Sequence, residues 1–131
     1  MRFSIFGLAA LLAACNSAAA PRVGDEFTLR VGQSASIPEI NLWMRFIKVV
    51  NDSRCPSTVE CFAEGDGAVL IEVAPLSGDS KEDTLHTSLG PRTIPLGGAE
   101  LQLVKLDPYP ATAASIAPGD YIVTLATRAV P

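Results

Sequence analysis

The two-residue period of the apolar side chains most constrains this chain, and glycine or proline interrupts it at short intervals. Phe27, Leu29 and Val31, for example, alternate with polar residues. Successive side chains of a strand point to opposite faces of a sheet, whereas an amphipathic helix repeats about every 3.6 residues. The pattern therefore predicts strands joined by turns, and we expect an all-β protein.

Seven segments fit this description. They are residues 27–31, 35–37, 42–50, 68–73, 84–89, 100–106 and 121–128. The third is apolar on both alternating sets, which is typical of a strand covered on both faces and places Trp43 in the core. Seven short strands favour an immunoglobulin-like antiparallel β-sandwich over a closed barrel, with the strand order left open. Tyr121 resembles the tyrosine that opens a late sandwich strand, so we expect its hydroxyl to bond to nearby backbone.

Composition and charge indicate one folded domain and restrict its partners. The chain has 131 residues, of which 48% are hydrophobic and 18% are charged. This balance is typical of a soluble globular protein. The net charge of −4 argues against nucleic acid as a partner, because binding to phosphates requires a basic patch.

The first fifteen residues resemble the leader of a bacterial lipoprotein. Arg2 is followed by an apolar run over residues 3–12, and small residues precede Cys15. A membrane-spanning helix needs about 20 residues, so this run is too short to be one. The resemblance implies cleavage before Cys15 and a diacylglycerol on its sulfur, with a further acyl chain for stable anchoring. The alternative is an ordinary signal peptide in which Cys15 is incidental.

This leader predicts how the chain is organised and where it resides. Residues 1–14 are the signal peptide, residues 15–22 a lipidated tether and residues 23–131 the β-sandwich domain. The membrane is then a partner through the lipid on Cys15. In Gram-negative lipoproteins an aspartate after the cysteine commonly causes inner-membrane retention, so Asn16 favours the outer membrane, facing the periplasm.

Two further cysteines, Cys55 and Cys61, predict a disulfide, because an even number of cysteines in an exported domain is typical of oxidised pairs. Closing a loop of about seven residues stabilises a fold by roughly 2.4 kcal/mol. The alternative is a metal-handling or redox protein that uses this loop or His86. Redox pairs usually have C-x-x-C spacing and zinc sites need four ligands, so we expect a structural disulfide, with no metal and no cofactor.

The segment from Asp52 to Cys61 resembles a family of uncharacterised bacterial lipoproteins. That family shares Asp-Ser-Arg-Cys-Pro with a second cysteine six residues on, and later pieces agree in order, including Leu106-Asp107-Pro108-Tyr109-Pro110. The chain departs from the family at Phe62-Ala63, because Ala63 stands where the family often has a tryptophan. The resemblance implies fold and location, and it brings no established activity.

The region around the cysteines is acidic, which raises calcium as a ligand. It holds Asp52, Glu60, Glu64 and Asp66. In an EF-hand register the first and twelfth ligands would fall on Phe62 and Val73, which do not coordinate cations. We therefore expect solvated turn acids, with Asp52 closing an Asx-turn.

His86 is the only histidine, so a catalytic triad would have to be built on it. Alternation places it with Thr84 and Ser88 on an exposed face. The chain contains neither a G-x-S-x-G elbow nor an H-E-x-x-H motif. We therefore expect an exposed histidine, no catalytic residues and no enzymatic activity.

Arg54 and Tyr109 are the candidate binding residues, together with Asp52. Pro108 and Pro110 hold Tyr109 outside the sheet, and the cysteine loop stiffens Arg54. We expect both segments to meet at one end of the sandwich and to bind an envelope protein or a small ligand. The alternatives are that Arg54 pins Asp52 and that Tyr109 covers the sandwich end. The sequence thus favours a membrane-anchored, non-catalytic binding or cell-envelope accessory module.

The leader makes a direct prediction about Cys15. Cys15→Ser removes the sulfur that carries the lipid, so the protein should move from the membrane pellet to the soluble fraction. Fractionation with a carbonate wash, followed by immunoblotting, measures this. A substituted protein that still pellets after the wash would show that Cys15 is not the anchor.

Overall fold

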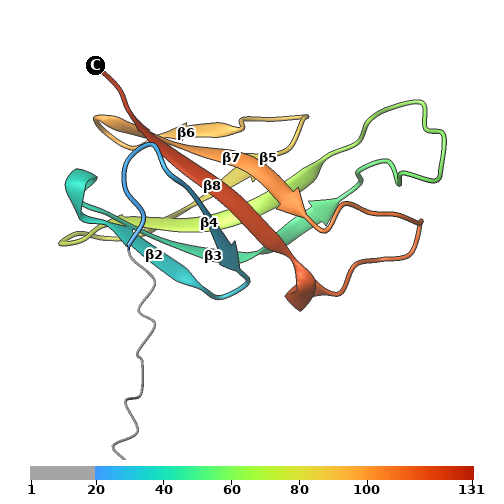
Figure 1. Ribbon diagram of the computed structural model, residues 1–131, viewed down its shortest axis with the longest axis horizontal. Coiled ribbons are helices and arrows are strands. Elements are labelled where there is room, and N and C mark those ends of the chain that lie inside the picture. The colour runs from blue at the N-terminus through green and yellow to red at the C-terminus, as the bar shows by residue number, and fades with distance from the viewer. Residues whose placement is uncertain (1–19) are drawn as a thin grey trace, which may run out of the picture.

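The computed structural model describes residues 20–131 as two packed antiparallel sheets of four strands each (Figure 1). The first sheet has the order β1-β8-β7-β6 and the second β2-β3-β4-β5. The strands are β1 (Glu26–Arg30), β2 (Ser34–Ile37), β3 (Leu42–Asp52), β4 (Gly67–Pro75), β5 (Lys81–His86), β6 (Thr93–Pro95), β7 (Ala99–Asp107) and β8 (Ile122–Ala129). Two short 3-10 helices are η1 (Pro38–Ile40) and η2 (Pro118–Asp120). The prediction of an all-β sandwich is confirmed.

The predicted leader and Cys15 lie outside the described residues, as do residues 15–19 of the predicted tether. From residue 20 onward, no helix has the length and apolar character needed to cross a membrane.

Neighbouring strands in each sheet follow one another along the chain, except for β1 and β8. These two pair although they lie near opposite ends of the described chain, with Phe27 opposite Leu125 and Leu29 opposite Val123. Apart from the β1–β8 pair, each sheet is therefore a meander of consecutive strands. The two-layer architecture is the one that immunoglobulin-like domains share. This order is what the sequence left open.

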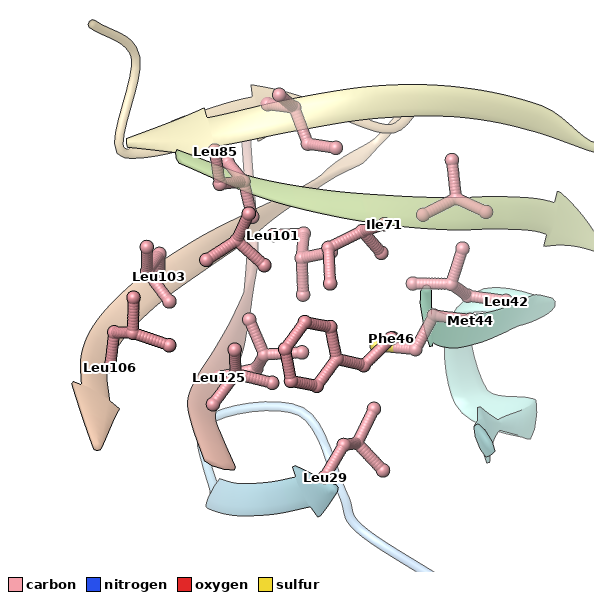
Figure 2. Packing of buried hydrophobic residues seen from close by; sticks show 14 of the residues in the cluster. Leu29, Leu42, Met44, Phe46, Ile71, Leu85, Leu101, Leu103, Leu106 and Leu125 are labelled. Carbon is pink, nitrogen blue, oxygen red and sulfur yellow. The ribbon is translucent and has the colours of Figure 1, made fainter. Parts of the chain in front are cut away.

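The hydrophobic core lies between the two sheets (Figure 2). The ring of Phe46, from β3, is surrounded by aliphatic side chains from both layers, among them Leu29, Ile71 and Leu125. Phe46, Ile71 and Leu125 are completely buried. Each strand contributes to this core the side chains of its inner face alone, because no third layer of described residues covers the outer face of either sheet.

Trp43 lies on that outer face, so its predicted place in the core is wrong. Its neighbour Met44 points inward and is fully buried, while Trp43 is only partly buried. The guanidinium of Arg45 sits 5.9 Å from the centroid of the indole ring. Because the arginine covers the aromatic face, an apolar residue is tolerated there without a covering layer.

Two strands differ from those predicted. β6 was not expected, because it has three residues, follows Pro91 closely and ends in Pro95. β5 begins three residues earlier than expected, at Lys81, and ends at His86. Its first residues are charged, which hides a strand in the sequence but is common in edge strands, where charge discourages pairing with other chains.

Candidate functional site

The cysteine loop and the Pro-Tyr-Pro segment meet at one end of the sandwich, as predicted (Figure 1). The backbone N–H of Ser57 donates to the carbonyl of Pro110 at 3.0 Å. The hydroxyl of Tyr109 donates to the carbonyl of Cys55 at 2.7 Å. We call this region the loop end and define it as residues 51–66, 87–92 and 105–120. Its three segments come from the β3–β4, β5–β6 and β7–β8 connections, with the adjoining strand ends.

Cys55 and Cys61 form a disulfide, which confirms the predicted pairing. Both sulfurs are therefore engaged, and from residue 20 onward no group of three or more His, Cys, Asp or Glu side chains could hold a metal ion. The loop returns to the sheet through Gly65, whose φ is +73°. A Cβ there would lie 1.8 Å from the carbonyl oxygen of Ser53, so only glycine fits.

Arg54 is buried and joins the two segments. Its Nε and Nη2 donate to the two carboxylate oxygens of Asp52, at 2.8 Å and 2.9 Å. Nη1 donates to the carbonyl of Leu106 at 2.7 Å, and Nη2 also donates to that of Pro108 at 2.9 Å. The interpretation that Arg54 pins Asp52 is thus confirmed. The guanidinium is directed into the protein and is not presented to a partner, because only 7% of the residue is exposed.

Asp52 connects this arginine to the second half of the domain. Its Oδ2 accepts a hydrogen bond from the hydroxyl of Tyr121 at 2.8 Å, so the expected backbone partner of that hydroxyl is wrong. Burial alone would raise the pKa of Asp52, but the hydrogen bonds from Arg54 and Tyr121 outweigh it and hold this pKa below its usual value. Burial and the nearby carboxylate together raise the pKa of Tyr121 to about 12. The N–H of Arg54 approaches Asp52 Oδ1 at 3.4 Å, in the pattern of the predicted Asx-turn.

Tyr109 combines the two roles considered for it. Its ring centroid lies 5.2 Å from the Arg54 guanidinium carbon, and its hydroxyl is bonded to the cysteine loop. About half of the residue, 52%, remains exposed. The side chain therefore covers the arginine on one side and offers an aromatic surface to solvent on the other.

Asp66 is buried and Asp52 is partly buried, so the expectation of a solvated turn residue is wrong for both. Its Oδ1 accepts hydrogen bonds from the backbone N–H groups of Ser88 at 2.9 Å and Leu89 at 3.1 Å. Its Oδ2 lies 2.6 Å from Nδ1 of His86. Burial alone would raise the pKa of Asp66, but these hydrogen bonds outweigh it and lower the pKa to about 2. Asp66 thereby joins the cysteine loop to the β5–β6 connection.

His86 is partly buried, so its predicted exposure is wrong. The turn after β5 folds back over it, and Gly90 packs so closely that a Cβ there would lie 2.4 Å from Cδ2 of the ring. The imidazole is thus held between Asp66 and a glycine backbone. No local signal marks Asp66 as its partner, because the two residues are twenty positions apart and meet only when β4 pairs with β5.

The exposed residues of the loop end include four of the seven large hydrophobic side chains that are exposed between residues 20 and 131. The four are Val59, Phe62, Leu89 and Tyr109. Phe62 follows directly after the disulfide and is fully exposed. Glu60 and Glu64, two positions before and after it, are exposed as predicted. Sequence reasoning mentioned Phe62 only as a departure from the family pattern and as a position that cannot coordinate calcium.

Two hollows open at the loop end. A cavity of about 340 Å³ is lined by polar groups of Asp52, Arg54 and Tyr121 and by the segment from Ala113 to Ile116. A smaller one of about 180 Å³ is lined by Glu64, Arg92, Lys105 and Tyr109, among others. The first has the volume of a site for a small molecule. Its carboxylate, however, is already bonded to the guanidinium and the phenol beside it.

Comparison of the chain with protein-family models, with curated proteins and with solved structures found no match. The resemblance to bacterial lipoproteins therefore rests on the quoted motifs alone. What the loop end does must be inferred from its own geometry.

The position of Arg54 predicts a large effect on stability. Arg54→Ala leaves the partly buried Asp52 carboxylate without its main donor and removes the bonds to Leu106 and Pro108, which should lower the free energy of unfolding by about 3 kcal/mol. Arg128→Ala is the matched control, because Arg128 forms an exposed ion pair with Glu100, and should cost about 1 kcal/mol or less. Urea unfolding measures both. Equal, small losses would show that Arg54 does not hold the loop end together.

The lowered pKa of Asp66 predicts acid sensitivity. The pKa falls from 3.8 to about 2 on folding, so the ionised group stabilises the fold above about pH 4. This stabilisation, about 2 kcal/mol, is lost as the pH falls through 2. Asp66→Asn should therefore be less stable at neutral pH and lose less stability on acidification. Urea unfolding across this pH range tests it, with Asp79→Asn, which changes an exposed turn residue, as the control. An unchanged pH slope in Asp66→Asn would contradict the assignment.

Proposed function

We propose that this protein is a lipid-anchored, non-catalytic binding or accessory module of the bacterial cell envelope, with the loop end as its binding surface. The lipobox pattern before Cys15 supports the anchor and the resemblance to bacterial lipoproteins. Asn16 supports the outer membrane, with the domain facing the periplasm. End loops on a rigid sandwich are a common place for binding residues.

The single observation that carries the proposal is Phe62, a fully exposed aromatic side chain on a loop that is fixed at several points. The disulfide closes the loop beside it, and the bonds of Arg54 hold the base of the loop to the sheet. Burying an aromatic ring in an interface contributes strongly to affinity. A loop that is already ordered loses little conformational entropy on binding, so more of that contribution is retained.

The titratable groups of the loop end support binding over catalysis. Asp52 is bonded to Arg54 and Tyr121, and Asp66 to His86. The hydroxyl of Ser88, which lies beside the Asp66 cluster, donates to the carbonyl of Gly65. These groups hold the connections together, whereas acid-base catalysis requires a group within reach of a substrate proton.

The same geometry favours a protein partner over a small ligand. The carboxylate oxygens in the cavity of about 340 Å³ accept their hydrogen bonds from within the protein. A ligand there would have to displace these bonds or rely on apolar contact. Phe62, Leu89 and Tyr109 instead project from the three separate connections of the loop end, as contacts across a protein interface do.

The proposal predicts where a partner can be crosslinked in cells. A photocrosslinking benzophenone amino acid at position 62 should give a covalent adduct with an envelope protein, because this side chain lies in the interface. The matched position is 76, where an exposed leucine follows β4 at the opposite end of the sandwich. Immunoblotting and mass spectrometry detect the adduct. Equal adducts at both positions, or none at position 62, would contradict a binding role for the loop end.

A further inference from the structure

We propose that the partner of the loop end is a protein with an apolar surface bordered by lysine or arginine side chains. Phe62 packs on the apolar part, while Glu60 and Glu64 meet the basic border. This inference rests on the proposed function and names the chemistry of the partner. Its basis is the charge that remains after the loop end has formed its own ion pairs.

The two glutamates beside Phe62 are exposed and carry no internal partner. None of the ion pairs formed between residues 20 and 131 includes Glu60 or Glu64. They make no side-chain hydrogen bond there either, in contrast to Asp52 and Asp66. Phe62 is therefore flanked in the sequence by two exposed carboxylates that are available to a partner.

The cationic side chains of the loop end are already bonded to other groups of the chain. Arg54 is buried against Asp52, and Nζ of Lys105 lies 3.1 Å from Oδ2 of Asp107. Arg92 donates to the carbonyls of Thr87 at 2.6 Å and Val104 at 3.0 Å. Arg92 and Lys105 share the cavity of about 180 Å³ with Glu64, yet carboxylates still outnumber cations in the loop end by six to three. The loop end as a whole is acidic and also exposes the apolar side chains of Phe62, Leu89 and Tyr109.

This charge distribution discriminates between possible occupants. A second copy bound through the same surface would bring four glutamates together, which like-charge repulsion disfavours. An anionic membrane surface would repel the same glutamates although it could accept the ring. A protein surface with an apolar centre and a basic border satisfies both features. Burial of the ring then supplies affinity, and the charges supply orientation and speed of association.

Defined amphipathic peptides test the inference. The probes are three helical peptides with one leucine face and a polar face of lysine, glutamine or glutamate, together with phosphatidylcholine vesicles with and without phosphatidylglycerol. The protein is the full mature chain from residue 15 with its disulfide intact, carrying Cys15→Ser so that no lipid contributes. Fluorescence titration measures each affinity, and circular dichroism checks that every variant is folded. We expect the order lysine, glutamine, glutamate, with the lysine peptide weakened by salt.

Matched variants separate the local charges from the overall charge. Glu60→Gln with Glu64→Gln should weaken binding of the lysine peptide by about threefold to tenfold. Glu39→Gln with Glu82→Gln removes two exposed carboxylates elsewhere and should change it by less than about twofold. Phe62→Ala should weaken it by at least about tenfold. Equal losses from the two glutamine pairs would overturn the inference, as would equal binding of the lysine and glutamate peptides.

Other occupants give different results, each of which overturns the inference. Phe62-dependent binding to vesicles that exceeds binding to every peptide would indicate a membrane. Concentration-dependent self-association that disappears in Phe62→Ala would indicate a second copy. The proposed function fails separately, when the crosslinker at position 62 captures nothing in cells. If it captures a protein whose binding ignores Glu60 and Glu64, only the present inference fails.

Discussion

The guanidinium of Arg54 is the interaction on which the arrangement of the loop end depends. It bonds in bidentate fashion to Asp52 and reaches the carbonyls of Leu106 and Pro108, so one buried group connects β3, the cysteine loop and the β7–β8 connection. A buried charge is stable only when it is paired and hydrogen-bonded, and here the pairing defines where each connection lies. The position of Tyr109 follows, because its ring lies over this guanidinium and its hydroxyl donates to the carbonyl of Cys55.

Asp66, which directly precedes the neighbouring strand β4, organises the loop end in the same way. Its carboxylate accepts hydrogen bonds from the backbone of the β5–β6 connection and contacts His86, while its backbone bonds to Ser53. Asp52 and Asp66, which flank the cysteine loop, therefore hold its two ends to neighbouring segments through hydrogen bonds. The two acids within the loop, Glu60 and Glu64, stay in solvent. This division leaves Phe62 exposed on an anchored loop between two solvated glutamates in the sequence, which is the basis of the proposed recognition role.

Local patterns predicted the layered fold well and the site less well. The alternation around Leu101 and Leu125 reports directly which faces are buried, since side chains of a strand alternate whatever the strand order. The disulfide could be predicted because Cys55 and Cys61 are the only cysteines between residues 20 and 131. Trp43 was misplaced because apolar residues on both faces of a strand predict two covering layers, whereas Arg45 covers the indole from the same strand.

The sequence by itself determined the all-β class, the antiparallel sandwich and the disulfide, because each depends on residue type and spacing along the chain. Only the tertiary structure decided that Asp66 is buried and Asp52 partly buried, while Glu60 and Glu64 are exposed. These four acids look alike in the sequence. Beside the local donor Arg54, the two aspartates have partners 20 and 69 positions away, which are His86 for Asp66 and Tyr121 for Asp52. The free energy of a carboxylate depends on the donors around it, and those donors are assembled only when the sheets pack.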